Sequence, residues 1–226
     1  MTQNLPAVED DFDSVEQAIA AIAAGGFAVV VDDTDRENEG DLIIAAEKIT
    51  AAQMAFLVRY SSGVVCVALT GERLDQLQLP LMVSSNNESQ RTAFTVTVDY
   101  LHGTSTGISA ADRAATLRAL ADSRIPASDF ARPGHIFPLR YAPGGVLARP
   151  GHTEAALDLS RLAGLAPAGV LCEIVNDDGS MARRPELLRF ARQHGLPIIT
   201  IADLIAYRER TGMAALASAA PVGEPA

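Results

Sequence analysis

Short apolar runs that alternate with helix-forming stretches most limit what this chain can fold into. Strands are expected at residues 27–31, 42–46, 64–69, 94–98, 169–175 and 197–201. Helices are expected at about residues 14–25, 50–60, 109–120, 153–164 and 185–194. Ser14, Thr50 and Ser109 have the side chains that cap helix N-termini. Alternation of this kind predicts an α/β or α+β architecture in which helices are layered on one sheet.

The pattern predicts a single domain over residues 14–210. No internal repeat and no Gly/Ser-rich linker divides it. Apolar residues make up 48% of the 226-residue chain, which excludes a disordered chain and supplies a sizeable core. Residues 1–13 are expected to form an N-terminal extension, and the Ala/Pro-rich residues 211–226 a flexible C-terminal tail.

Charge and cysteine content exclude several functional classes. Lys and Arg number 18 against 28 Asp and Glu, so the formal charge is −10, which disfavours binding to nucleic acid or anionic membranes. The two cysteines, Cys66 and Cys172, lie in separate apolar runs, so a disulfide framework and a four-cysteine zinc site are both excluded. With no basic signal-peptide region and no apolar stretch long enough to span a bilayer, a cytoplasmic location is expected.

Residues 32–41 concentrate half of the net charge of the chain. Six acids and one base give this segment a charge of −5, directly between two expected strands. Acids this dense repel one another unless a cation lies among them, and hard divalent cations prefer oxygen ligands. The segment is either a solvated acidic loop or a divalent-cation site, and its spacing does not match an EF-hand.

Two near-identical Arg-Pro-Gly-His turns contain half of the four histidines. The first covers residues 132–135 and the second residues 149–152. Thr153 then leads into an expected helix whose first amides could receive an anion, with Arg149 as a nearby positive charge. The duplication indicates either a functional pair of histidines or a turn that recurs by chance.

Two further features are weaker when each is taken alone. The loop at residues 103–107 is rich in glycine and hydroxyl groups, as phosphate or sugar sites are, but such loops are common. Glu173 lies inside an apolar strand, where an ionisable group either faces solvent at a sheet edge or is a buried acid or base.

Together these segments resemble one known family. They lie at residues 35–42, 106–113, 132–135, 149–155 and 173–183. In this order, over roughly residues 14–207, they closely resemble 3,4-dihydroxy-2-butanone 4-phosphate synthase of riboflavin biosynthesis. Two positions depart from the commonest family pattern: Ser105 stands where threonine is more usual, and Pro150 occupies a variable position. Neither departure removes a functional group.

The resemblance implies a lyase that converts D-ribulose 5-phosphate to L-3,4-dihydroxy-2-butanone 4-phosphate and formate. It implies Mg²⁺ as cofactor, with Mn²⁺ able to substitute and up to two ions in each site. The family fold is an α/β sandwich on a mixed sheet, and its members are homodimers. Some relatives continue into a GTP cyclohydrolase II domain, which needs a cysteine-ligated zinc. This chain has only two dispersed cysteines, so it is expected to be monofunctional.

The resemblance also assigns roles to residues. Metal binding falls to Glu37 and His152, with Glu39 close enough to take part. Catalysis falls to His135 and Glu173, joined by Asp41 as a proton-transfer group. The substrate contacts that it implies are Arg36, Glu37, Asp41, Thr106, Arg149, Pro150, Gly151, His152, Thr153 and Glu173.

Two other functional classes compete with this interpretation. One is a magnesium-dependent sugar-phosphate isomerase or phosphatase that uses the same acidic loop. The other is a metal- or nucleotide-binding module without enzymatic activity. Formate release distinguishes the first, because only the synthase reaction loses a carbon. Alanine at His135 or Glu173 distinguishes the second, because a binding module would tolerate it.

Overall fold

The computed structural model describes residues 12–212, and within them seven strands form one mixed sheet. The strand order is β4-β5-β3-β6-β2-β1-β7. The strands are β1 (Ala28–Val31), β2 (Gly40–Ala45), β3 (Cys66–Leu69), β4 (Val98–Tyr100), β5 (Phe130–Arg140), β6 (Ala168–Glu173) and β7 (Ile198–Thr200). Strand β2 is antiparallel to β1 and β6, whereas β3 and β5, like β1 and β7, are parallel.

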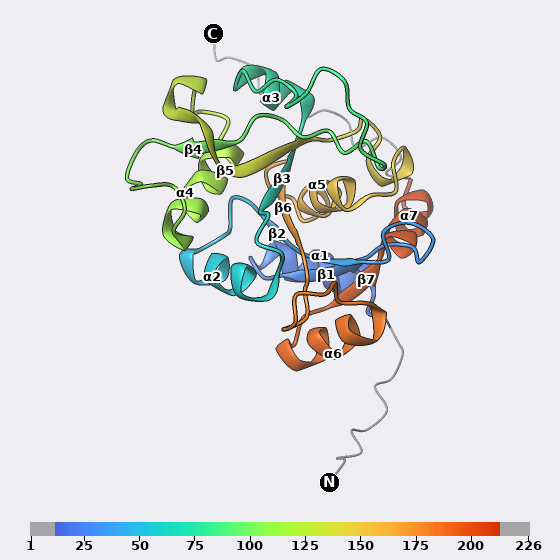
Figure 1. Ribbon diagram of the computed structural model, residues 1–226. Coiled ribbons are helices and arrows are strands. Elements are labelled where there is room, and N and C mark those ends of the chain that lie inside the picture. The colour runs from blue at the N-terminus through green and yellow to red at the C-terminus, as the bar shows by residue number, and fades with distance from the viewer. Residues whose placement is uncertain (1–11, 213–226) are drawn as a thin grey trace.

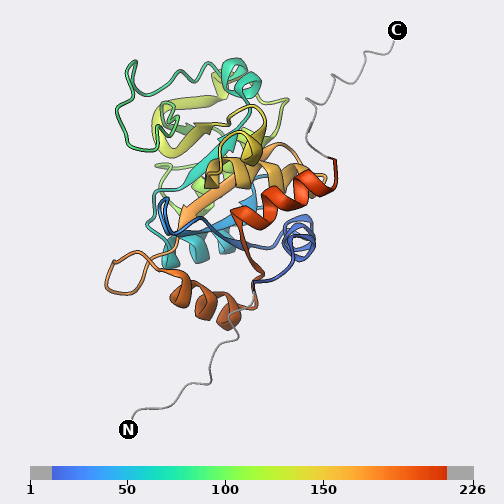
Figure 2. The same cartoon turned by 90° about the vertical axis from the view of Figure 1, so that its right-hand side faces the viewer.

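Helices cover both faces of this sheet. They are α1 (Val15–Ala23), α2 (Ala51–Tyr60), α3 (Gly71–Gln76), α4 (Ala110–Ala121), α5 (His152–Leu162), α6 (Arg184–His194) and α7 (Ile201–Arg210). Helix α5 lies against one side of the central strands and α2 and α4 lie against the other (Figure 1). Helices α1 and α7 lie side by side on the α5 face (Figure 2). None of the helices in residues 12–212 is both long and apolar enough to cross a lipid bilayer.

This arrangement confirms the predicted α/β layering on a single mixed sheet. Each face of the sheet has its own apolar core, because alternate strand residues point to opposite faces. Ser14, Thr50 and Ser109 cap α1, α2 and α4 as expected, each accepting a backbone N–H three residues later. The single-domain boundaries stay a prediction, and the parts of the expected terminal segments at 1–11 and 213–226 lie outside the described residues.

Several elements differ from the expectation. The strand expected at residues 94–98 contributes only isolated bridges at Phe94 and Thr95, and the ladder strand β4 begins at Val98. Helices α3 and α7 were not predicted, although Thr200 and Asp203 form a capping box that marks the start of α7. Strand β5 was not predicted, and residues 132–135 within it were expected to form a turn, because its prolines, glycine and exposed residues interrupt the alternation of a strand.

The close packing of α5 on the sheet determines where the polar residues meet. A Cβ at Gly169 would lie 2.2 Å from the backbone oxygen of Ala156, so only glycine lets the helix approach β6 this closely. The N-terminus of α5 places His152 near Asp41 on the neighbouring strand β2. A cluster of charged groups thus forms on the α5 face of the sheet, which also carries one of the two apolar cores.

Candidate functional site

The acidic loop between β1 and β2 is folded around one buried carboxylate. Asp32 has a fully buried side chain, and its Oδ2 accepts hydrogen bonds from the Arg36 guanidinium at 3.0 Å and the Glu37 N–H at 3.0 Å. Its Oδ1 accepts the Glu39 N–H at 2.9 Å. Asn38 between them has φ +55°, a left-handed conformation that asparagine tolerates better than most residues. The loop is therefore an ordered structure rather than a solvated acidic run.

Glu37 and Asp41 meet His152 at the end of this loop. Nδ1 of His152 lies 3.3 Å from Oε2 of Glu37 and 3.8 Å from Oδ1 of Asp41. The His152 hydrogen bond, together with Arg36, lowers the pKa of Glu37 against the effect of burial. Burial raises the pKa of Asp41 to about 8. Burial alone would lower the pKa of His152, but the facing Asp41 and Glu37 carboxylates outweigh it and raise this pKa to about 9.

Glu173 lies directly across the strand ladder from Asp41. The antiparallel register of β2 and β6 pairs these two residues. Like charges at directly opposed positions destabilise a sheet, so this pair marks the site as functional. Ser62 holds the carboxylate of Glu173, donating a hydrogen bond from its hydroxyl to Oε2 at 2.5 Å.

The N-terminus of α5 offers backbone amides to the same region. Gly151 is its N-cap, and no side chain caps this end of the helix, so the first amides are available to an anion. Arg149 beside it is already engaged: it donates to buried Glu154 at 2.7 Å, to the Gln90 carbonyl at 3.1 Å and to Thr92 at 3.2 Å. The guanidinium therefore also ties the loop around residues 86–92 to α5.

These groups line one cavity of about 200 Å³. The predicted site residues among its lining are Arg36, Glu37, Asp41, Arg149, His152, Thr153 and Glu173. Their convergence from the acidic loop, α5 and β6 confirms that segments far apart in the sequence form one pocket.

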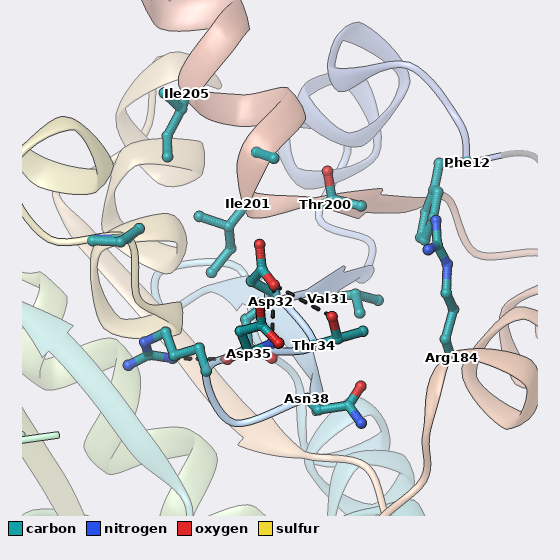
Figure 3. A pocket seen from close by; sticks show the side chains of 14 residues that line it. Phe12, Val31, Asp32, Thr34, Asp35, Asn38, Arg184, Thr200, Ile201 and Ile205 are labelled. Atoms are coloured by element: carbon teal, nitrogen blue, oxygen red, sulfur yellow. Dashed lines mark hydrogen bonds and ion pairs between the residues drawn. The ribbon is translucent and has the colours of Figure 1, made fainter. Parts of the chain in front are cut away.

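A larger cavity of about 430 Å³ shares only Arg36 with this pocket. Asp32, Thr34, Asp35 and Asn38 of the acidic loop face it, opposite Ile201 and Ile205 of α7 (Figure 3). Pro150 lines this second cavity, although it was expected to contact the substrate. The smaller cavity is the candidate active site, because only it contains His152, Asp41 and Glu173.

His135 and Thr106 do not line either cavity. Phe137, Cys66, Leu171 and Ile43 form one row across β5, β3, β6 and β2. His135 lies two residues before Phe137 on β5, and Glu173 lies two residues after Leu171 on β6, so both are toward the end of the sheet that carries Asp41. Two strand spacings separate β5 from β6, which is about 10 Å. His135 is thus at the same end of the sheet, to one side of the pocket within a single chain.

Several lining residues were missed by the sequence interpretation. They are Cys66, Glu88, Thr92, Phe94, Leu139 and Leu171. Glu88 is a carboxylate whose pKa the amides of Gln90 and Thr92 lower to about 2. No local sequence pattern marks these residues, because they come from β3, β5, β6 and the segment at 88–94, which meet at the site only in the folded chain.

The residues present fit a divalent cation. Asp32, Glu37 and His152 each offer a ligand atom, and the three atoms lie within 4.8 Å of one another. Oδ1 of Asp41 and Nε2 of His152 are buried without hydrogen-bond partners in the described part of the chain. A cation held near Glu37 and Nδ1 of His152 would give Asp41 Oδ1 a partner, and the burial of such an oxygen unpaired is otherwise costly. Glu39 is not in this group and instead lies 3.9 Å from Arg183.

Known proteins that resemble this chain belong to the family that the sequence motifs indicate. The sequence model of the 3,4-dihydroxy-2-butanone 4-phosphate synthase family matches residues 16–207. The chain is 61% identical over 193 residues to the synthase of that name from Agrobacterium fabrum, covering 85% of this chain and 91% of that one. It is 62% identical over 200 residues to riboflavin biosynthesis protein RibBA from Salinispora arenicola, covering 88% of this chain but 48% of that relative. The chain thus spans about half the length of the latter.

Among solved structures, the chain resembles a 3,4-dihydroxy-2-butanone 4-phosphate synthase in complex with two magnesium ions. The two are 50% identical, with a TM-score of 0.86 over 89% of this chain and 99% of that chain. This likeness extends the agreement from the sequence to the whole described fold.

The Asp41–His152 pair predicts a pH dependence of stability in chelated protein. Both groups hold protons more tightly in the folded state than in the unfolded chain, where their pKa values are about 4 and 6.5. Stability should therefore fall as pH rises from about 4 to 9, through Asp41 up to about pH 8 and through His152 from about pH 6.5, because the folded state binds more protons over that range. Urea unfolding with EDTA across this range measures the slope. Asp41→Asn should flatten it, whereas Asp35→Asn on the exposed loop should not, and equal slopes would contradict this assignment.

Proposed function

The chain belongs to the 3,4-dihydroxy-2-butanone 4-phosphate synthase family, and we propose that it converts D-ribulose 5-phosphate to L-3,4-dihydroxy-2-butanone 4-phosphate and formate. The observation that carries this proposal is the meeting of Glu37, Asp41, His152 and Glu173 at one cavity. Two carboxylates opposed across a ladder beside a buried imidazole suit a reaction made of successive proton transfers.

Glu37 and His152 are the proposed metal ligands, and Asp41 has an unpartnered buried oxygen beside them. A divalent cation held there supplies Lewis-acid polarisation of the substrate oxygens. Mg²⁺ is the proposed ion, with Mn²⁺ as a substitute. Glu39 lies on the same ordered loop, and its pKa is raised by burial and by the Glu37 charge, which suits a second, more peripheral contact to the cation.

Asp41 and Glu173 are the proposed proton carriers within the pocket. Enolisation of a ketose removes a proton next to a carbonyl, which needs a base within hydrogen-bond reach. Ser62 fixes one orientation of Glu173, and the β2–β6 ladder fixes its distance from Asp41. Burial raises the pKa of Asp41 to about 8, so this group can both accept and return a proton during the proposed rearrangement.

The phosphate is proposed to bind at the α5 N-terminus. Thr153 and the uncapped first-turn amides face the cavity, and Arg36 lies at its edge. Glu154 already pairs with Arg149, so we propose that Arg149 acts on phosphate binding mainly by holding the loop at residues 86–92 beside the pocket. Gly151 permits this geometry, because a Cβ there would lie 2.5 Å from an Arg149 nitrogen.

Relatives of this chain include both shorter synthases and longer riboflavin biosynthesis proteins. The monofunctional interpretation stays a prediction. The isomerase and phosphatase alternatives use the same site residues, so the reaction product is the discriminating measurement.

Metal dependence and reaction type can be tested together. Purified chain with ribulose 5-phosphate and Mg²⁺ should release formate, and EDTA should abolish the release until Mg²⁺ is restored. Glu37→Ala should lower the rate about a hundredfold or more and weaken Mg²⁺ binding by calorimetry, because it removes a ligand. Asp33→Ala, on the exposed side of the same loop, should change either by less than about threefold. Full activity in metal-free protein, or turnover without formate, would reject the proposal.

Variants at Glu173 and Arg149 should separate a loss of turnover from a loss of substrate binding. Glu173→Gln keeps the shape and the Ser62 contact but loses the base, so it should bind ribulose 5-phosphate normally while turnover falls about a hundredfold. Arg149→Ala frees the loop at residues 86–92 and should raise KM more than it lowers kcat. Calorimetric binding beside formate release measures both. If Glu173→Gln binds weakly and turns over normally at saturation, Glu173 is a binding residue.

We further propose a homodimer, in agreement with the family resemblance. His135 and Thr106 stand to one side of the pocket in a single chain, so a second copy is needed if they are to act on its substrate. Large apolar side chains are exposed beside them: Leu101 at 53% and Ile108 at 51% flank the loop that carries Thr106. Exposed apolar groups of this kind mark a protein–protein contact.

The assembly has its own test. The subunit mass is 23.8 kDa, so light scattering should give about twice this value at micromolar concentration. Ile108→Asp should shift the equilibrium to the monomer and lower activity with it. Ala52→Asp places the same charge on an exposed position of α2 and should leave the dimer intact. A wild-type monomer with full activity would contradict the proposal.

A further inference from the structure

Asp99 holds His135 by two separate hydrogen bonds. Its Oδ1 accepts the backbone N–H of His135 at 2.9 Å, and its Oδ2 lies 2.6 Å from the ring nitrogen Nδ1. The carboxylate is largely buried, with 13% of the side chain exposed, against 41% for His135. We propose that Asp99 is a positioning residue that fixes His135 with Nδ1 protonated and Nε2 free to exchange a proton with the substrate. This inference rests on the proposed function of His135.

The sheet creates this contact through an irregularity between β4 and β5. Val98 is opposite Ile136, whereas the next residue, Asp99, is opposite Ala131. Residues 132–135 therefore leave the ladder with β4, and the backbone N–H groups of Gly134 and His135 need other acceptors. Thr97 Oγ1 accepts the Gly134 N–H at 3.0 Å, and Asp99 accepts the His135 N–H. Side chains of the segment at 97–99 thus replace the missing ladder carbonyls.

Two glycines leave room for the pair and enclose it. A Cβ at Gly107, where φ is +89°, would lie 2.0 Å from Asp99 Oδ2 and 2.8 Å from His135 Nδ1. A Cβ at Gly134 would lie 2.0 Å from the backbone carbon of Val98. Gly107 therefore lies directly against the Asp99–His135 contact and Gly134 against the backbone of Val98, so a side chain at either position would disturb this arrangement.

The proton positions follow from the chemistry of the two groups. An ionised carboxylate only accepts hydrogen bonds, so Nδ1 of His135 must be the donor. Nε2 makes no hydrogen bond among the described residues, and 41% of the His135 side chain is exposed. A histidine oriented by a buried carboxylate at Nδ1 presents Nε2 as the base, which is the arrangement used in Ser-His-Asp enzymes.

The other histidines lack this combination. His102 lies 3.5 Å from Asp129, and its side chain is 63% exposed. His152 is buried, and its Nδ1 faces Glu37 and Asp41 in the proposed metal site. His194 packs among the rings of Phe56, Tyr60 and Phe190. In the described chain, His135 alone combines a largely buried orienting carboxylate with an accessible second nitrogen.

Asp99→Asn tests the proposal with little change in shape. The asparagine oxygen can still accept the His135 backbone N–H, but its amide then offers a donor to Nδ1, so the proton should move to Nε2. Side-chain ¹⁵N NMR of His135 at alkaline pH should show protonated Nδ1 in the wild type and protonated Nε2 in the variant. Formate release should show kcat lower by about a hundredfold with KM within about threefold.

Asp129→Asn is the matched control, because it removes the carboxylate from His102 and should leave both measurements unchanged. A wild-type His135 that is protonated on Nε2 would overturn the proposal without any variant, even if Asp99→Asn failed to fold. A change of tautomer without loss of kcat would also overturn it. The NMR measurement does not depend on turnover, so a wild type that releases no formate would reject the proposed function separately.

Discussion

The pairing of Asp41 with Glu173 across adjacent strands is the constraint on which the rest of the site depends. An antiparallel ladder holds these carboxylates on one sheet face, where their charges repel and burial is unfavourable. The fold offsets this with His152 from α5, whose imidazole faces Asp41 and Glu37. The position of α5 depends in turn on Gly169, because the absence of a side chain there lets the helix pack closely on the sheet. Core packing and site electrostatics are thus parts of one arrangement.

The acidic loop is ordered by hydrogen bonds to its backbone as well as by the ion pair of Asp32 with Arg36. Asp32 accepts the amides of Glu37 and Glu39 from within the loop. Arg183, from just before α6, donates to the carbonyls of Glu37 and Asn38 from outside. The loop therefore presents Glu37 to His152 in a fixed orientation, while Asp33 and Asp35 remain exposed. An ordered ligand loop lowers the entropic cost of binding a cation, because its conformation does not have to be selected.

The two Arg-Pro-Gly-His turns show how one short pattern acquires two roles. Arg132 of the first turn donates to the carbonyls of Leu77 and Ala127, a purely structural contact. Arg149 of the second pairs with Glu154 at the pocket. The histidines also differ: His135 is exposed and held by Asp99, whereas His152 is buried against carboxylates. The duplication therefore places two histidines in different environments, each with its own acidic partner.

Local sequence determined the features that depend on neighbouring residues. The caps at Ser14, Thr50 and Ser109, the buried strands and the charge of the acidic loop all follow from short-range pattern, and the family resemblance added the residue roles. Tertiary structure alone decided the rest. The Asp41–Glu173 pairing, the contact of Asp99 with His135 and the capture of the 86–92 loop by Arg149 join residues 36 to 132 positions apart. Their distances depend on strand register and on how closely helix and sheet pack, and neither is encoded by any single stretch of the chain.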